Sequence, residues 1–350
     1  MTTPEKMSGI VMNGHGGPEM LEWRDDLTVP TPGKNDVIVR VKAAGVNNTD
    51  INTRIGWYAK TDVDVDGDEA GWSDTPLTFP RIQGADVCGE IVAVGDAIDA
   101  SRIGERILIE PCLWEVNGTT REIPWYFGSE CDGGFAQFTR VAAVHAHKVE
   151  TDLNDLELAS FPCSYSTAEN MLTRANVSEG ETVLVTGASG GVGSAAIQLA
   201  QARGAKVIAV TSASKAQALL DLGAIKTLDR NDDFVAEIGA NSVDVVIDLV
   251  AGEKWPTLLD VLRPKGRYAV SGAIGGHSVE LDVRTLYLKD LSFFGCTVLE
   301  REVFGNLVKR IERKEIAPLV AETFALRDID EAQKAFNEKG HIGKIVLKVD

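Results

Sequence analysis

A run of glycines at residues 187–193 carries the clearest indication of chemistry in this sequence. Residues 182–193 read Thr-Val-Leu-Val-Thr-Gly-Ala-Ser-Gly-Gly-Val-Gly, and small and apolar residues then recur through Ala200 as they do in a helix. Glycines let the backbone approach a pyrophosphate, whose charge meets the free N–H groups where a helix begins. The segment therefore predicts a dinucleotide-binding turn of variant sequence. A glycine turn used only to pack a strand closely on a helix remains the alternative.

The residues after the next predicted strand bear on the choice of cofactor. Proteins that bind NAD keep Asp or Glu about 20 residues after the glycines, where it holds the ribose 2′-hydroxyl. Here the strand at 207–210 is followed by Thr-Ser-Ala-Ser-Lys, which offers Ser212 and Lys215 in place of an acid. Hydroxyls and an ammonium group suit a 2′-phosphate, so NADPH is predicted in preference to NADH. The simpler alternative is that Ser212 caps the following helix and Lys215 is only solvated.

The composition is that of an ordinary globular protein, and it limits the partners. Of the 350 residues, 44% are hydrophobic and 25% are charged. A net charge of −17 would repel phosphates, so neither nucleic acid nor an anionic membrane is an expected partner. Five scattered cysteines without a C-x-x-C pair, and no signal-peptide pattern, predict a cytoplasmic protein with free thiols.

The hydrophobic pattern changes near residue 157. Before it, alternating apolar residues predict strands at 36–42, 89–95 and 106–110. After a helical segment at 158–175, strand and helix patterns alternate to residue 298, which predicts a parallel sheet with crossover helices. The tail holds helical patterns at 303–313 and 329–338 and a last strand at 344–349.

Two long segments stand outside this pattern. Residues 59–78 are rich in Asp, and residues 112–134 place Trp and other aromatic residues among polar ones; both are predicted to be functional loops. Asp62, Asp64 and Asp66 match the start of a calcium-binding loop, but Ser73 stands where the bidentate Glu belongs. A solvated surface insertion is the favoured interpretation of that segment.

A set of short motifs in a particular order resembles the medium-chain dehydrogenase/reductase superfamily, and within it the zinc-free quinone-oxidoreductase-like branch. These motifs are residues 44–50 (Ala-Gly-Val-Asn-Asn-Thr-Asp), 84–89 (Gly-Ala-Asp-Val-Cys-Gly), 133–136, 166–168, the glycine turn and 340–347 (Gly-His-Ile-Gly-Lys-Ile-Val-Leu). The resemblance implies an α/β fold: a GroES-like, β-rich catalytic domain built from both chain ends, with an inserted Rossmann-type doubly wound parallel sheet. It implies boundaries of 1–156 and 299–350 for the catalytic domain and 157–298 for the NADP-binding domain.

The same resemblance bears on metal binding. Zinc-dependent members place Cys, His and Cys where this chain has Asn47, Ala85 and, nearby, Cys163. A catalytic zinc needs about three Cys, His or carboxylate ligands, and here only Cys163 and the carboxylate of Asp86 are on offer. The four close cysteines of a structural zinc lobe are also missing. No metal is therefore expected, and Cys163 is favoured as a small buried hydrophobic residue.

The implied function is hydride transfer from NADPH to a quinone or to a carbonyl-activated double bond. Asn47 and Tyr58 are the candidate catalytic donors, each with an ordinary alternative as a turn or core residue, and Asn52 departs from the Tyr common in quinone reductases. An alcohol or aldehyde oxidoreductase and a non-catalytic NADPH-binding protein are the rival functions. The predicted cofactor-binding residues are Thr167, Gly187, Ala188, Ser189, Gly190, Gly191, Val192, Gly193, Ser212, Lys215, Arg230, Val250, Ser271, Gly272 and Ala273.

An assembly is predicted as well. Residues 291–298 (Leu-Ser-Phe-Phe-Gly-Cys-Thr-Val) are expected to form the sixth and last strand of the parallel sheet. This strand carries neither proline nor an inward charge, so its free edge would be unprotected. Relatives commonly dimerise through the equivalent strand, and a homodimer is predicted. Cover by the chain's own tail is the alternative.

Overall fold

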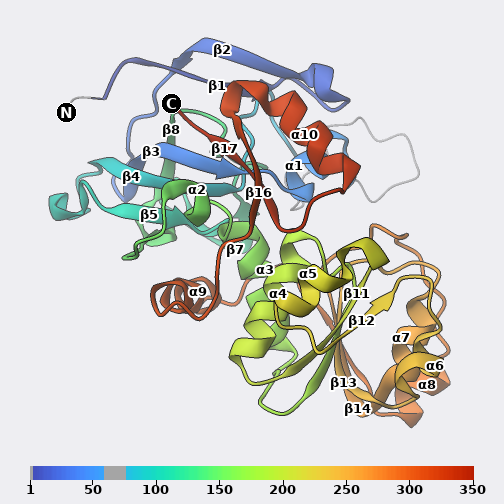
Figure 1. The fold of residues 1–350 in the computed structure, drawn as a ribbon. Helices are drawn as coiled ribbons and strands as arrows, with labels where there is room; N and C mark the ends of the chain where they lie inside the picture. Colours follow the sequence, from blue (N-terminus) through green and yellow to red (C-terminus); the bar gives the residue numbers. More distant parts are fainter. Residues whose placement is uncertain (1–2, 59–75) are drawn as a thin grey trace. The chain divides into compact units, whose positions relative to one another are not determined.

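The chain divides into two compact units in the computed structural model, which describes residues 3–58 and 76–350. Unit 1 comprises residues 1–163, 318–340 and 344–350, and unit 2 comprises residues 164–317 and 341–343. The chain thus leaves unit 1, builds unit 2 and returns, as the blue and red ends of the ribbon show (Figure 1). The boundaries lie at 163/164 and 317/318, later than the expected 156/157 and 298/299.

Unit 1 is organised around a seven-stranded sheet. Its path runs β16-β17-β3-β4-β5-β9, and β8 also pairs with β3. The strands are β3 (Asp36–Gly45), β4 (Asp86–Val94), β5 (Arg106–Ile109), β8 (Phe138–Ala142), β9 (Ala146–Lys148), β16 (Val320–Ala325) and β17 (Lys344–Lys348). Because β17 pairs antiparallel with β3, with Val346 opposite Gly45, the C-terminal strand lies against the first half of the domain.

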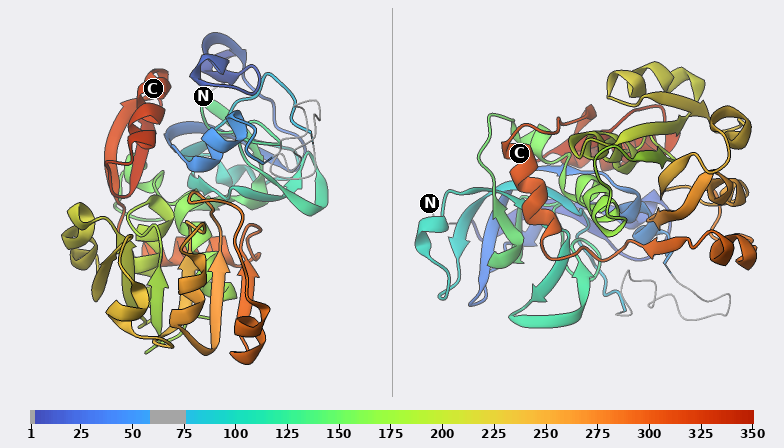
Figure 2. Two further views of the ribbon diagram at one scale, coloured as in Figure 1. Left: turned by 90° about the vertical axis from the view of Figure 1, so that its right-hand side faces the viewer. Right: turned by 90° about the horizontal axis from the view of Figure 1, so that it is seen from below.

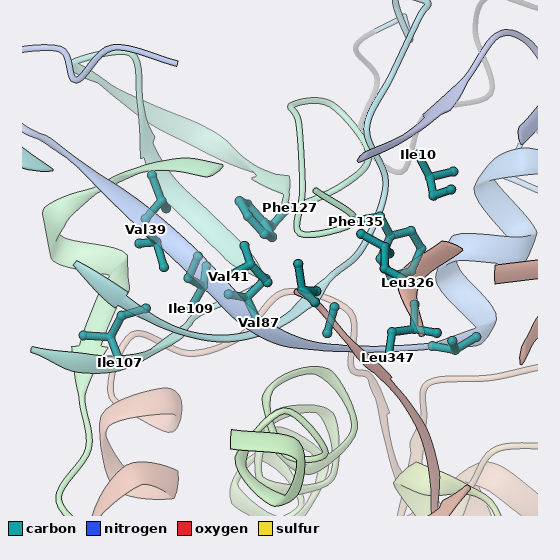
Figure 3. Close-up of a cluster of buried hydrophobic side chains, with 14 of the residues drawn as sticks. Ile10, Val39, Val41, Val87, Ile107, Ile109, Phe127, Phe135, Leu326 and Leu347 are labelled. Atoms are coloured by element: carbon teal, nitrogen blue, oxygen red, sulfur yellow. The ribbon is translucent and has the colours of Figure 1, made fainter. Parts of the chain in front are cut away.

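Two hairpins and three α-helices complete the described part of unit 1. The hairpins are β1 (Lys6–Met12) with β2 (Leu21–Thr28), and β6 (Cys112–Val116) with β7 (Thr119–Tyr126). The helices are α1 (Asn48–Arg54), α2 (Asp155–Leu158) and α10 (Ile329–Glu338). Aliphatic residues of alternating strand positions and the rings of Phe127 and Phe135 fill the core (Figure 3). Leu326 and Leu347 bring the returning tail into the same core, so unit 1 requires both chain ends.

Unit 2 contains a six-stranded parallel sheet of order β12-β11-β10-β13-β14-β15. The strands are β10 (Thr182–Val185), β11 (Lys206–Thr211), β12 (Lys226–Asp229), β13 (Val243–Asp248), β14 (Leu262–Val270) and β15 (Ser292–Gly295). Strand order reverses between β10 and β13, which is the doubly wound arrangement whose switch point accepts a dinucleotide. The predicted fold class is therefore confirmed.

The helices of unit 2 cover both faces of its sheet. They are α3 (Pro162–Arg174, which starts just before the unit boundary), α4 (Gly191–Ala202), α5 (Ala216–Asp221), α6 (Phe234–Ile238), α7 (Trp255–Val261), α8 (Val283–Leu288) and α9 (Val303–Glu312). Figures 1 and 2 show α4 and α5 on one face and α6, α7 and α8 on the other. Because helices cover both faces of the sheet, side chains on both sides of each strand are buried, and the strands are continuous apolar runs in the sequence.

Of the two segments predicted to be functional loops, one contains a hairpin and the other lies mostly outside the described residues. Residues 112–134 are not a loop without secondary structure, because β6 and β7 form a hairpin there. Its turn is Asn117-Gly118, both with positive φ (53° and 72°), and Asn-Gly between apolar runs is a strong hairpin signal that the sequence displayed. Most of the acidic segment, including Asp62, Asp64, Asp66 and Ser73, lies outside the described residues. Within the described chain, no helix has the length and apolar character to cross a membrane.

Strand β15 is the last strand on its side of the parallel sheet, as predicted for residues 291–298, although it is shorter than expected. Apolar side chains are exposed on α8, the helix that precedes β15 in the chain: Leu288 is 72% exposed, Tyr287 60% and Val283 59%. An unpaired strand edge next to exposed apolar residues is typical of a surface that another chain covers. We propose that a second copy of this chain covers it, with β15 pairing antiparallel across a twofold axis.

We expect light scattering to give a dimer mass at micromolar concentration. Leu288→Glu and Thr297→Lys should each shift the mass to that of a monomer, because a desolvated charge would oppose association. Ile225→Glu is the matched control, since Ile225 is 60% exposed beside β12 at the opposite edge of the sheet. A monomeric wild-type protein would refute the proposed dimer, and a dimer insensitive to both variants would place its interface elsewhere.

Candidate functional site

The glycine turn joins β10 to α4 with the geometry of an anion-binding site. Gly187 has φ of 56°, and α4 begins at Gly191 with Gly190 as an N-cap that offers no side-chain hydrogen bond. The first N–H groups of the helix are thus left for a ligand. A Cβ at Gly193 would lie 2.4 Å from the carbonyl oxygen of Gly187, so only glycine allows this tight approach. These residues fit a pyrophosphate.

The carboxyl end of β11 fits the ribose part of a nucleotide. Thr211 is 6% exposed, and its hydroxyl has no hydrogen-bond partner in the structure. Ser212 follows, with its hydroxyl 3.2 Å from that of Ser214. Lys215 donates from Nζ to the carbonyl oxygen of His341 at 2.7 Å, and burial lowers its pKa. Ser212 accepts no capping hydrogen bond, so the alternative role predicted for its side chain is not the one it has here.

Charge near this strand end is mixed. Arg230 is exposed directly after β12, and its N–H donates to the carbonyl oxygen of Thr211 at 3.2 Å, which brings the two strand ends together. Asp229 lies opposite Thr211 in the strand pairing, so a carboxylate also stands close by. Thr167 is half-buried on α3 and remains a predicted contact.

A buried carboxylate shapes the loops after β13 and β14. Asp248 is fully buried and accepts from the hydroxyls of Thr186 (2.5 Å) and Tyr268 (2.6 Å). It also accepts from the N–H groups of Val250 and Ala251 at 2.9 and 3.1 Å, and so fixes the turn that follows. The N–H of Gly275 donates to the carbonyl oxygen of Val250, which ties the segment after Ser271, Gly272 and Ala273 to the same turn. The predicted cofactor-binding residues of these loops, Val250, Ser271, Gly272 and Ala273, thus lie at the edge where the parallel strands end.

In unit 1, Asn47 belongs to a buried ionic cluster. Lys344 Nζ donates to Asn47 Oδ1 at 2.5 Å and to the carbonyl oxygen of Val46 at 3.0 Å, and it contacts Asp86 Oδ2 at 2.7 Å. Asn47 Nδ2 donates to the same Asp86 oxygen at 2.8 Å. Exposures of 5% for Asn47, 2% for Lys344 and 0% for Asp86 show that the cluster is sealed from bulk water.

Three different segments bring this cluster together. Asp86 opens β4, Lys344 opens β17, and Asn47 is the N-cap of α1 with a capping box to Asp50. The pairing of both strands with the end of β3 sets the spacing, since Gly45 lies opposite Asp86 on one side and Val346 on the other. A Cβ at Gly45 would lie 2.4 Å from Asp86 Oδ2, so glycine is required for the carboxylate to fit there.

Asp50 adds a second carboxyl group to the cluster. Its Oδ2 accepts from the N–H of Asn47 at 2.8 Å. Burial and, to a smaller extent, nearby Asp86 raise the pKa of Asp50 to about 7, although hydrogen bonds from backbone N–H groups oppose the shift. At neutral pH this carboxyl is therefore partly protonated, which limits the negative charge that Lys344 must balance.

Cys163 is buried at the same place. Its N–H donates to Asp86 Oδ1 at 2.5 Å, and its Sγ lies 3.0 Å from the hydroxyl of Tyr126. Burial raises the pKa of the Cys163 thiol to about 12, so the sulfur carries its proton at neutral pH. The packing of Cys163 with Ala85 and Tyr126 agrees with the buried, hydrophobic role favoured from the sequence.

Tyr58 is the predicted residue that offers a hydroxyl. It lies half-buried after α1, and its hydroxyl donates to Thr49 Oγ1 at 3.2 Å. Burial raises its pKa, while hydrogen bonds with Thr49 and Asn52 oppose the shift. The phenol thus remains protonated at neutral pH. By contrast, both polar ends of the Asn47 side chain are already hydrogen-bonded, the oxygen to Lys344 and the nitrogen to Asp86. Any effect of Asn47 on a substrate would therefore be indirect.

Sequence reasoning missed four residues that the structure adds to these sites: Thr49, Asp248, Tyr126 and Lys344. For Lys344 a signal existed, because a lysine stands at the head of the apolar run Ile-Val-Leu, where a charge needs a buried partner. Thr49 directly follows the quoted Asn residues. Nothing in the sequence pairs Tyr126 with Cys163, since 37 residues separate them.

The cluster does not fit a zinc ion. Among the described residues, no group of three or more His, Cys, Asp or Glu side chains is placed to hold a metal ion. Instead, the Lys344 ammonium group contacts the Asp86 carboxylate near the ligand positions of zinc-dependent members, and burial raises the pKa of the nearby Cys163 thiol.

Comparison with known proteins places both units in one family. The model described as "Alcohol dehydrogenase GroES-like domain" matches residues 33–151, and that described as "Zinc-binding dehydrogenase" matches residues 191–313. A candidate alcohol dehydrogenase from Sinorhizobium meliloti 1021 has a similar structure, with a TM-score of 0.90, 43% identity and coverage of 99% of this chain and 98% of that one.

Two curated relatives match almost end to end. Acryloyl-coenzyme A reductase of Metallosphaera sedula is 29% identical, with 97% of this chain and 99% of that protein covered. Quinone oxidoreductase of Homo sapiens is also 29% identical, with 99% of each covered. With its two matching domains and these relatives, the chain belongs to the medium-chain dehydrogenase/reductase superfamily, in the quinone-oxidoreductase-like branch, and is an oxidoreductase.

Proposed function

We propose that this protein transfers a hydride from NADPH to a quinone or to the activated double bond of an enone- or enoyl-type carbonyl compound, without a metal ion. The observation that carries the proposal is the pair Tyr58 and Thr49: a protonated phenol held by a hydroxyl, on a unit whose described residues include no metal-ligand set. The relatives named as acryloyl-coenzyme A reductase and quinone oxidoreductase support this substrate class.

The chemistry divides between the cofactor and the chain. A bound reduced nicotinamide supplies the hydride. Hydride arriving at the β-carbon of an enone, or at a quinone, leaves negative charge on a substrate oxygen. A hydrogen-bond donor at that oxygen stabilises this charge. The Tyr58 hydroxyl can turn its proton toward the substrate while Thr49 donates to the phenol oxygen, so both hydrogen bonds are kept.

The preference for NADPH rests on the end of β11. Thr211, Ser212 and Ser214 offer hydroxyls, and Lys215 and Arg230 offer positive charge to a 2′-phosphate. Residues 211–215 include no acid that would hold a 2′-hydroxyl in its place. We also propose a cytoplasmic location, which suits the five free cysteines.

Steady-state assays with a panel of enones, enoyl thioesters, quinones, aldehydes and alcohols test the reaction. We expect NADPH-dependent turnover of enones, enoyl thioesters or quinones that persists in a strong chelator, because the residues that the structure describes form no metal-ligand cluster. Turnover restricted to aldehydes and alcohols would favour the rival oxidoreductase. Binding of NADPH without turnover of any class would favour a non-catalytic role.

Tyr58→Phe should lower kcat for the best substrate on the order of 100-fold, as expected when one donor to a developing oxyanion is lost. KM should change little, because the ring and its packing remain. Thr49→Val should have a smaller effect in the same direction. Tyr287→Phe is the control, since that tyrosine is 60% exposed on α8. Unchanged kcat in Tyr58→Phe would exclude Tyr58 as the donor.

Lys215→Ala should weaken NADPH binding about 10- to 100-fold, which is the loss of one charge-assisted contact to a phosphate. NADH binding should barely change, because NADH lacks that phosphate. Fluorescence titration measures both dissociation constants. Lys206→Ala is the matched control, since Lys206 lies at the other end of β11. Equal affinity of the wild-type protein for the two cofactors would contradict the predicted preference.

A further inference from the structure

A buried arginine in unit 1 has no anion in contact with it. Arg54, the last residue of α1, is 2% exposed. Its Nη1 donates to the carbonyl oxygen of Gly16 at 2.8 Å, and its Nη2 donates to Oε1 of Gln333 at 3.0 Å. Both acceptors are uncharged, and no carboxylate among the described residues forms an ion pair with this guanidinium group. Buried charges in proteins are normally paired, so this cation calls for an anion from outside the chain.

Gln333 on α10 supplies a second donor at the same place. It is 1% exposed, and because a guanidinium group can only donate, the amide oxygen of Gln333 must face Arg54. The amide nitrogen, Nε2, is then left without an acceptor, as is Nε of Arg54. Buried donors are almost always hydrogen-bonded in proteins, so two neighbouring N–H groups here lack the oxygen acceptors that they need.

A cavity adjoins this pair of donors. Arg54 and Gln333 line a space of about 440 Å³, within the size range of small-molecule sites. One face of α10, which lies next to α1 in Figure 1, forms most of the remaining lining. On that face Asp330, Lys334 and Glu338 recur every four residues, so their side chains project on the same side of the helix. The unpaired cation thus borders a space that a ligand can enter.

The charges of the lining define the class of ligand. At the buried end, the N–H groups of Arg54 and Gln333 suit a carboxylate. At the exposed end, the carboxylates of Asp330 and Glu338 would attract an ammonium group and repel a doubly charged anion such as phosphate. With Lys334 and Arg54 as the cations, the lining has two positive and two negative side chains, so a ligand without net charge is favoured.

We propose that this cavity binds a small zwitterion of the α-amino acid type, with its carboxylate on Arg54 and Gln333. The ammonium group of the ligand lies toward Asp330 and Glu338. Such a ligand supplies the acceptors that Arg54 Nε and Gln333 Nε2 lack. The site belongs to unit 1 alone, and it requires neither a dinucleotide nor the proposed reaction.

Three probes that differ by one group each test this chemistry. L-Alanine carries both charges, propionate lacks the ammonium group, and ethylamine lacks the carboxylate. NMR titration of the Arg54 Nε–H signal measures binding at the buried end. We expect alanine to shift this signal with a dissociation constant on the order of millimolar, as suits so small a ligand. Propionate should bind about 5-fold more weakly, which is the loss of a largely exposed ion pair. Ethylamine and inorganic phosphate should leave the signal unchanged.

Gln333→Glu is the decisive variant, because it places a carboxylate of the same shape against Arg54 within the protein itself. This internal anion should abolish alanine binding and raise the midpoint of thermal unfolding. Asp330→Asn/Glu338→Gln should remove the preference for alanine over propionate, because the ammonium group loses its partners. Glu331→Gln is the matched control: Glu331 is exposed on α10 away from the cavity lining, and its substitution should change neither affinity.

The outcomes that contradict the proposal are distinct. An Arg54 signal that does not respond to alanine well above millimolar concentration would overturn it, as would a folded Gln333→Glu variant that binds alanine like the wild-type protein. Tighter binding of propionate or phosphate than of alanine would refute the zwitterion. If Gln333→Glu does not fold, the wild-type titrations and the Asp330→Asn/Glu338→Gln variant still decide. None of these measurements involves NADPH or turnover, so failure of the proposed function would be seen separately in the substrate panel.

Discussion

An ammonium group buried from water is stable only beside a carboxylate and enough acceptors to replace its hydration. In unit 1 this requirement is met by Asp86, Asn47 and the carbonyl oxygen of Val46 around Lys344. Lys344 and Asn47 are 297 residues apart in the chain, so the cluster forms only when β17 pairs with β3. The catalytic side of unit 1 thus depends on the return of the chain after unit 2 is built.

Unit 2 presents mainly backbone groups to a ligand. Its parallel strands all end at one edge, where the helix N-terminus after Gly190 and the hydroxyl of Thr211 are left for a ligand. Asp248 supports that edge by accepting hydrogen bonds from Thr186, Tyr268 and the turn after β13. Unit 2 thus offers a dinucleotide backbone groups and hydroxyls at this edge, and under the proposed function the Tyr58 phenol of unit 1 would donate to the substrate's oxygen.

Much of unit 2 could be predicted because its signals are local. The strand before the glycines, the turn and the start of α4 lie where the sequence placed them, and the alternation to residue 298 predicted the parallel sheet. In unit 1 the strands are short and their partners distant, so β1, β2 and β16 went unpredicted. The prediction of a loop in place of the β6–β7 hairpin was an avoidable error, because Asn117-Gly118 marks the turn of the hairpin.

By itself, the sequence indicated the parallel sheet of unit 2 and the glycine turn, since both follow from residue types at fixed local spacing. The fold of unit 1 and the absence of zinc ligands at the family's positions followed from the ordered motifs that resemble the superfamily. Only the tertiary structure decided what Asn47 does. Its side chain was expected to face a substrate, but Lys344 and Asp86 engage both of its polar ends. The physical reason is that a charge pair forms between segments that strand pairing brings together, and no local pattern records which buried carboxylate a distant lysine will meet.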